Sequence, residues 1–229
     1  MTLSTASFAF LRGLAANNEK AWFEAHRPEY EQHVKVPMAA LVGAVSAGLA
    51  ARGLPLEGDA KRSMFRINRD TRFSNDKSPY KTSVGVVWYR QGSGKDGAGV
   101  VYFHLGARGC FIAAAFYMPE PEVLSTIRER MRVYPDKWLA TVATVERAGL
   151  AVETMDSLKR MPKGFEDMKD SPVAEGLRMR SLIARRVLLD SEVIGSKLVP
   201  AIVDLAAGAL PLLQFGWAAV DEVSGGRVV

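Results

Sequence analysis

The sequence predicts an α+β fold with a central, mainly antiparallel sheet and helices from both ends of the chain packed around it. Apolar residues recur at helical spacing near both ends. Three runs rich in β-branched and aromatic residues lie between them, at residues 83–91, 98–106 and 110–118. Turn residues join these runs directly, which favours antiparallel over parallel pairing. Because no linker or internal repeat interrupts the chain, we expect a single domain over residues 1–229.

The first helix is predicted close to the amino terminus. Ser4 or Thr5 can cap it, because both side chains accept a hydrogen bond from the first turn of a helix. Phe8, Leu11 and Leu14 follow at a spacing of three residues. This spacing is typical of a stripe that packs on a core.

A second helix brings aromatic residues and two histidines near one face, since Trp22, His26 and His33 recur at multiples of three or four residues. Pro28 and Pro37 fit the first turns of restarted helices. A metal site needs three or four donors at definite spacing, and no such set accompanies the two histidines. We therefore interpret them as packed or partly exposed imidazoles and expect no metal.

The second half of the chain is predicted to continue the α+β pattern. We expect, in order, a helix from Pro119 to about Tyr134, a helix from Asp136 to Gly149, a short strand over 151–155, a loop over 158–172, a strand over 181–189 and a helical region to about residue 222. The most apolar stretch is 198–220, which Asp204 and Pro211 interrupt. It therefore indicates a broken pair of core helices, not a membrane span.

Composition indicates a soluble protein. Apolar residues make up 48% of the chain and charged residues 24%, the proportions of ordinary globular domains. The single cysteine, Cys110, excludes an internal disulfide and fits a reducing compartment. It lies in an apolar run, which favours a buried thiol over a nucleophile. We read no secretory signal and expect a cytoplasmic protein without a membrane partner.

Residues 61–81 carry an unusual local charge. Seven side chains are basic and two are acidic, and this segment accounts for the whole formal net charge of +5. The basic residues are Lys61, Arg62, Arg66, Arg69, Arg72, Lys77 and Lys81, and the acids are Asp70 and Asp76. Such an excess concentrates anions if the segment folds onto one face. The segment is therefore the main candidate for function.

The basic segment predicts a binding site for an anionic small molecule. Its first part, residues 64–68, has the composition of a strand, and the following residues have that of a loop. Arginine suits two-pronged binding of phosphate or carboxylate, and lysine adds a point charge. The candidate ligand-binding residues are Arg66, Arg69, Arg72, Lys77 and Lys81.

Two alternatives stay open for the same segment. Phe65, Phe73 and Tyr80 are interleaved with the cations, a pattern that also suits a nucleic acid or an acidic protein partner. The isoelectric point of about 9.4 fits nucleic acid, whereas the modest net charge disfavours it. In the other alternative the arginines pair with Asp70, Asp76 and other acids and only pin the loop.

The residues do not establish whether the chain is an enzyme. Asp70 or His104 could act as a base and Tyr80 as a proton donor, but no signature of a reaction class accompanies them. Residues 92–97, GSGKDG, match a dinucleotide-binding pattern in letters. A strand follows these glycines where the motif needs a helix, so we predict a hairpin turn and no cofactor. The oligomeric state is not indicated.

Three segments resemble a known family. They are NNEKAWFEAHRPEYEQHVKVP, FRINRDTRFSNDKSPYKTSVGV and LKRMPKGFEDMKDSP. In order and spacing they are similar to the conserved hypothetical proteins known as domain of unknown function 2461, over about residues 8–215. The last family motif usually reads Asp-His-Pro, where this chain has Asp170-Ser171-Pro172. The resemblance implies no activity, and no role of that histidine carries over.

Overall fold

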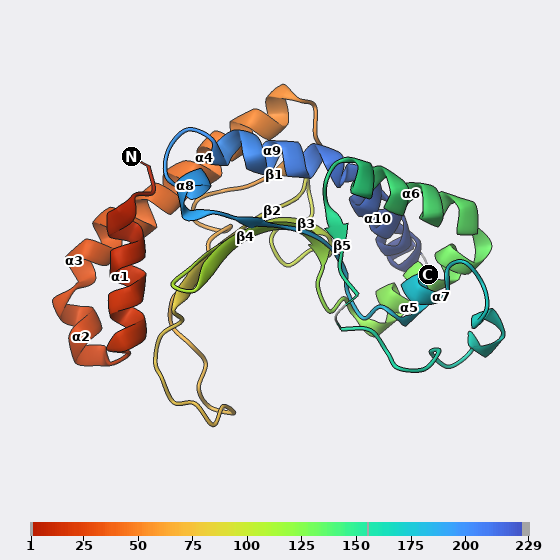
Figure 1. Ribbon diagram of the computed structural model, residues 1–229, viewed down its shortest axis with the longest axis horizontal. Helices are drawn as coiled ribbons and strands as arrows, with labels where there is room; N and C mark the ends of the chain where they lie inside the picture. Colours follow the sequence, from red (N-terminus) through yellow and green to blue (C-terminus); the bar gives the residue numbers. More distant parts are fainter. Residues whose placement is uncertain (1, 155, 226–229) are drawn as a thin grey trace. The chain divides into compact units, whose positions relative to one another are not determined.

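The α+β fold is confirmed by the computed structural model, which describes residues 2–154 and 156–225. The helices accompany a six-stranded antiparallel sheet in the order β1-β2-β3-β4-β6-β5 (Figure 1). The strands are β1 (Leu56–Glu57), β2 (Ser83–Arg90), β3 (Val100–Gly106), β4 (Gly109–Phe116), β5 (Ala151–Val152) and β6 (Leu182–Leu188). The three predicted central strands are therefore β2, β3 and β4.

The chain clusters into two compact units. The first comprises Met1–Lys95, Tyr102–Ile112 and Val187–Asp204, and the second comprises Asp96–Val101, Ala113–Arg186 and Leu205–Val229. Strands β3, β4 and β6 contribute residues to both units. The expected single domain stays a prediction, for which a single cooperative unfolding transition is the measurement.

Among its described residues, the first unit contains six complete helical segments, one of which packs on the sheet. They are α1 (Thr5–Ala16), α2 (Lys20–Ala25), α3 (Arg27–Tyr30), the π-helix η1 (Glu31–Lys35), α4 (Val36–Ala51) and α8 (Asp190–Val193). Pro28 and Pro37 lie in the first turns of α3 and α4, as predicted. Helix α4 packs on β1 and β2. There the indole N–H of Trp88 donates to the carbonyl of Val42 at 3.2 Å.

Strand β3 separates a buried face from a more open one. Its side chains Val101, Phe103 and Leu105 are fully buried, whereas Tyr102 and His104 between them are half-buried. This alternation is the two-residue period of a strand. The open face therefore presents Tyr102 and His104 toward solvent.

The glycines of residues 92–97 lie in the turn between β2 and β3, as predicted. Gly92 and Gly94 have φ angles of 82° and 74°, which only glycine adopts readily. The turn leads into strand β3 and into no helix. Residues 92–97 thus lack the strand-to-helix junction on which the dinucleotide motif depends.

The second unit packs its helices against one another. They are α5 (Pro121–Val133), α6 (Pro135–Arg147), η2 (Glu166–Met168), α7 (Ala174–Arg178) and α10 (Leu210–Gly225), and α9 (Leu198–Gly208) contributes to both units. Helix α10 lies against α5 and α6, where Arg130 pairs with Glu222 and Trp138 contacts Phe215 at 5.3 Å. The predicted strand 151–155 is β5, although Met155 lies outside the described residues.

The apolar stretch 198–220 forms two helices bent by 56°, as the predicted broken pair requires. By length and composition the helix Arg27–Ala51 could cross a membrane, as could the bent pair if it formed one span. This is a weak indication, because core helices pass the same test. Met38, Val42 and Val45 are fully buried, as expected of a helix that packs on a sheet.

Candidate functional site

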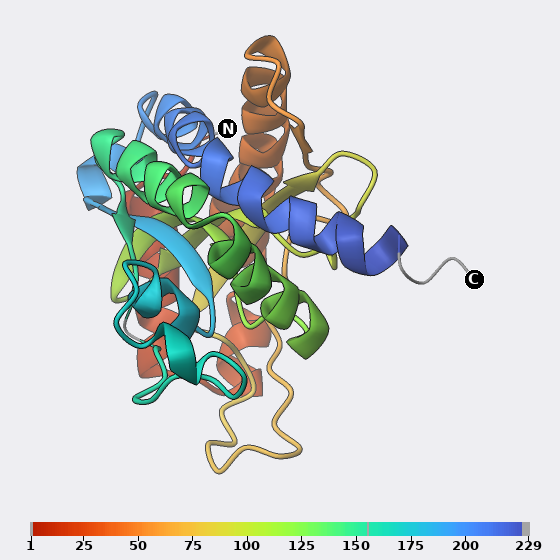
Figure 2. The same ribbon diagram turned by 90° about the vertical axis from the view of Figure 1, so that its right-hand side faces the viewer.

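The basic segment forms a hairpin that projects as an arm from the sheet (Figures 1 and 2). Residues 63–69 and 79–87 run antiparallel, with isolated bridges at Met64–Val86 and Asn68–Tyr80. Within residues 64–68 only Met64 and Asn68 form bridges, so the predicted strand 64–68 is not a continuous ladder. Between the bridges, the second side of the hairpin has two residues more than the first. The hairpin therefore bulges where it joins the sheet.

Two of the predicted ligand-binding arginines are held by local acids. The guanidinium of Arg69 forms an ion pair with Asp76, and that of Arg72 binds both oxygens of Asp70, at 3.0 and 2.7 Å. Hydrogen bonds from Ser78, and then from Arg69, lower the pKa of Asp76 to about 2. These contacts give the tip of the hairpin the ion-pair network that was one of the open alternatives.

The other three candidates have no acidic partner among the described residues. The ammonium of Lys77 donates to the carbonyl of Thr71 at 3.0 Å. That of Lys81 lies 5.8 Å from the ring centre of Phe65. Burial, and then the charge of Arg66, lower the pKa of Lys81. Arg66 and Lys81 are thus neighbouring cations without a direct ion pair among the described residues, although the charge of Arg66 still lowers the pKa of Asp70.

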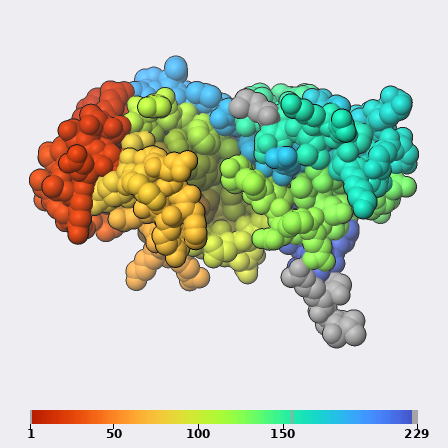
Figure 3. Space-filling view, turned by 90° about the horizontal axis from the view of Figure 1, so that it is seen from below, coloured from red at the N-terminus to blue at the C-terminus, as the bar shows by residue number. Residues whose placement is uncertain are grey.

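Arg66 lines a pocket of about 450 Å³ between the hairpin and the amino-terminal helices, here called the Arg66 pocket. Figure 3 shows these helices, in red, beside the amber hairpin. The pocket is lined by Lys20, Phe23, Glu24, Arg27, Tyr30, Glu31, Lys35, Arg66, Ile67, Asn68, Pro79 and Tyr80. All twelve belong to the first two of the three segments that carry the family resemblance.

Charges in the Arg66 pocket are unevenly paired. Its lining includes four cations and two carboxylates. Arg27 binds both oxygens of Glu24, and Lys35 pairs with Glu31 at 2.9 Å. The side chains of Lys20 and Arg66 form no hydrogen bond or ion pair with any residue that the structure describes. The pocket therefore has an excess of positive charge at these two side chains.

Two of the candidate catalytic residues are held in structural contacts. Tyr80 is buried and stacks on Phe23 with ring centres 4.2 Å apart. Its backbone N–H and carbonyl both bond the side-chain amide of Asn18, at 3.1 and 2.9 Å. Asp70 is engaged by Arg72, whose hydrogen bonds lower its pKa. A lowered pKa makes this carboxylate a weaker base.

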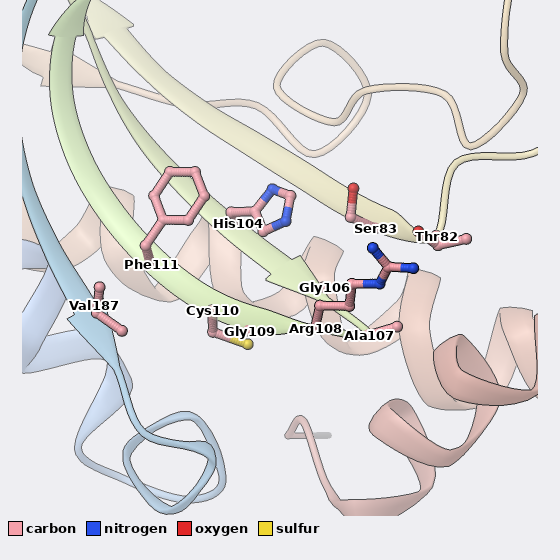
Figure 4. Close-up of a pocket in the computed structure, with 10 residues that line it drawn as sticks. All are labelled: Thr82, Ser83, His104, Gly106, Ala107, Arg108, Gly109, Cys110, Phe111 and Val187. Atoms are coloured by element: carbon pink, nitrogen blue, oxygen red, sulfur yellow. The ribbon is translucent and has the colours of Figure 1, made fainter. Parts of the chain in front are cut away.

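His104, the third candidate, lines a second pocket, of about 480 Å³, called the His104 pocket (Figure 4). The hydroxyl of Tyr102 lies 3.2 Å from its Nδ1. Its ring stacks on Phe111 at 4.7 Å and 13°. Burial lowers the pKa of His104 and raises that of Tyr102. The imidazole is therefore fixed in orientation and neutral at pH 7.

His104 predicts a pH dependence of stability. Its folded-state pKa lies below the ordinary value of 6.5, so the unfolded chain takes up a proton that the folded chain does not. The contribution of His104 is fully present above pH 6.5 and is lost as the pH falls to the folded-state pKa. We expect the stability difference between wild type and His104→Gln to shrink over this range in urea unfolding. A difference that grows toward low pH would contradict the burial of His104.

Two groups of pocket residues escaped the sequence interpretation. The sequence interpretation did not include Lys20, because it depended on the spacing of aromatic residues and histidines in this segment. Arg108 and Ser83 of the His104 pocket were also missed, since each stands in a turn or at a strand end without a motif. Residues 20–35 hold three basic and three acidic side chains, so a local charge count gives no signal for Lys20.

His26 and Cys110 have structural surroundings. His26 bonds the carbonyl of Trp22 at 2.8 Å and stacks on its ring at 4.0 Å. Cys110 is buried, which raises the pKa of its thiol. Within residues 2–154 and 156–225, no three potential metal ligands of the types histidine, cysteine, aspartate or glutamate lie together.

Comparisons with known proteins agree with the resemblance seen in the sequence. The model of a family described as "Conserved hypothetical protein (DUF2461)" matches residues 6–215. No curated protein and no solved structure is significantly similar to the chain. The description of the family states no activity, so the functional argument depends on the site itself.

Proposed function

The chain belongs to this family of conserved hypothetical proteins, and we propose that it binds an anionic small molecule, bearing phosphate or carboxylate, in the Arg66 pocket. One observation carries the proposal. Lys20 and Arg66 form no ion pair with a described residue and interact only at longer range with Glu24 and Asp70, whereas the other two cations of the pocket are paired. Arg66 supplies a planar pair of donors, and Lys20 supplies a point charge.

Lys81 strengthens the proposal from beside the pocket. Its pKa is lowered by burial and by Arg66, so the two cations repel each other. A bound anion would favour the charged form of Lys81 and relieve this repulsion. Of the five predicted ligand-binding residues, Arg66 and Lys81 are therefore the proposed contacts. Arg69 and Arg72 hold the hairpin in shape through their ion pairs.

Binding of inorganic phosphate, pyrophosphate or citrate tests the proposal by isothermal titration at constant ionic strength. We expect at least one of them to bind the wild-type chain. Arg66→Gln should weaken that binding at least about tenfold, because a hydrogen bond to a charged group is lost. Arg62→Gln is the matched control, since Arg62 is exposed in the same segment and lines neither pocket.

Two results would contradict the proposed anion site. One is the absence of binding by all three anions. The other is an equal loss of affinity in Arg62→Gln and Arg66→Gln, which would mean that diffuse charge and not the pocket attracts the anion. Circular dichroism of both variants checks that the fold is kept.

A nucleic acid is the second candidate ligand, and one observation favours it. Phe73 at the tip of the hairpin is 95% exposed, with the guanidinium of Arg72 at 5.8 Å from its ring centre. An exposed ring beside cations suits base stacking. A labelled single-stranded oligonucleotide at low salt tests this alternative. Affinity should fall steeply with salt, and the absence of binding at low salt would remove the alternative.

Neither pocket places two of the candidate catalytic residues together. We also propose that the chain acts in the cytoplasm. The buried single cysteine and the ordinary soluble composition support this location. Fractionation of cells that express the tagged chain would test it, and recovery with membranes would count against it.

A further inference from the structure

The His104 pocket contains several polar groups without a partner among the described residues. Its lining holds the hydroxyls of Thr82 and Ser83 and the guanidinium of Arg108, none of which forms a side-chain hydrogen bond or ion pair. Among the described residues the side chain of His104 forms one hydrogen bond, between Nδ1 and Tyr102, and Nε2 forms none. Such convergent, unsatisfied polar groups are typical of a ligand site.

The open polar groups can all donate a hydrogen bond. Burial keeps the phenol of Tyr102 protonated, and its O–H can donate to Nδ1 of His104. Nε2 of the neutral imidazole then carries the proton and is a donor. The guanidinium of Arg108 and both hydroxyls can also donate. No carboxylate lines the pocket, so its polar end suits an oxyanion.

The other end of the pocket is apolar. Figure 4 shows Phe111 and Val187 at one end, Ser83 and Arg108 at the other, and His104 between them. Val187 is 66% exposed, so its side chain is accessible to a ligand at this end. A ligand that covers it would remove apolar surface from water.

We propose that the His104 pocket is a second ligand site, for a small molecule with an apolar body and a single oxyanion head. The head lies at Arg108, Ser83 and Nε2 of His104, and the body lies on Phe111 and Val187. This site is independent of the proposed anion site, because the two pockets share no lining residue. The head is a carboxylate or a phosphate, which the experiment distinguishes.

Nuclear magnetic resonance of the three histidine rings tests this second site. Benzoate and phenyl phosphate are titrated against the full chain, with benzyl alcohol lacking the charge and acetate lacking the ring. We expect the His104 signals to move with benzoate or phenyl phosphate, and the tighter of the two identifies the head. Benzyl alcohol and acetate should bind at least about tenfold more weakly.

Three variants locate the binding. Arg108→Gln should weaken it at least about tenfold by removing the charged donor. Val187→Asp, at an exposed position, should weaken it by placing a carboxylate at the apolar end. Arg66→Gln should leave it unchanged. Failure of both aromatic anions to move the His104 signals, or unchanged affinity in Arg108→Gln and Val187→Asp, would overturn the second site. Loss in Arg66→Gln alone would overturn it by assigning binding to the Arg66 pocket.

Discussion

Trp88→Ala is expected to lower the free energy of unfolding by about 3–5 kcal/mol, the cost of removing a large aromatic side chain from a core. The indole is fully buried in β2 under helix α4. Truncation leaves a cavity between the sheet and the helix that surrounding side chains fill only in part. Urea unfolding followed by circular dichroism measures the loss.

Two controls separate packing from hydrogen bonding at Trp88. Trp88→Phe loses the N–H donor, but the carbonyl of Val42 still accepts from the hydroxyl of Ser46 at 2.8 Å. We therefore expect a clearly smaller loss than for alanine. Phe73→Ala at the exposed hairpin tip should change stability by no more than about 0.5 kcal/mol. Equal losses in Trp88→Ala and Phe73→Ala would contradict the core position of Trp88.

Gly99→Ala is expected to destabilise the second unit by about 2–5 kcal/mol, through backbone strain and steric overlap together. Gly99 has a φ angle of 83°. An added Cβ would lie 2.4 Å from the ring of Phe116 and 2.5 Å from Nε1 of Trp217. The same indole N–H donates to the carbonyl of Gly99 at 3.1 Å. The substitution should therefore displace two buried rings, which urea unfolding would detect.

Gly94→Ala is the matched control for the steric part. Gly94 has a similar φ angle, 74°, but no atom lies within 4 Å of an added Cβ. Only the left-handed backbone penalty applies there, about 1–2 kcal/mol. If both substitutions cost the same, the close approach of Phe116 and Trp217 plays no part in stability.

The regular elements could be predicted because their signals are local. Proline punctuation and apolar stripes predicted helices from Pro119 and Asp136, which begin at Pro121 and Pro135, and β-branched and aromatic residues placed β2, β3 and β4. Strand β1 has only two residues and gave no periodic signal. The π-helix Glu31–Lys35 was also missed, since one widened turn leaves the composition of a helix unchanged.

The sequence identified the segment of the candidate site but not which of its charged side chains form ion pairs. Local charge count identified the segment that holds Arg66, and this depends on sequence alone. Asp70 stands two residues before Arg72, so that ion pair was visible as an alternative. The meeting of Arg66 with Lys20 was not visible, because it depends on how the hairpin folds back on a distant helix. Which cations form ion pairs therefore depends on how the helices and the hairpin pack in the folded chain.

The side chain of Asn18 joins the amino-terminal helices to the hairpin. It accepts a hydrogen bond from the backbone N–H of Tyr80 and donates one to its carbonyl, as the backbone of a neighbouring strand would. Its partner is 62 residues further along the chain. During synthesis the helices therefore emerge from the ribosome long before the other wall of the Arg66 pocket exists. A nascent chain that ends before Tyr80 should have no affinity for phosphate, and acquisition of that affinity would report when the hairpin docks.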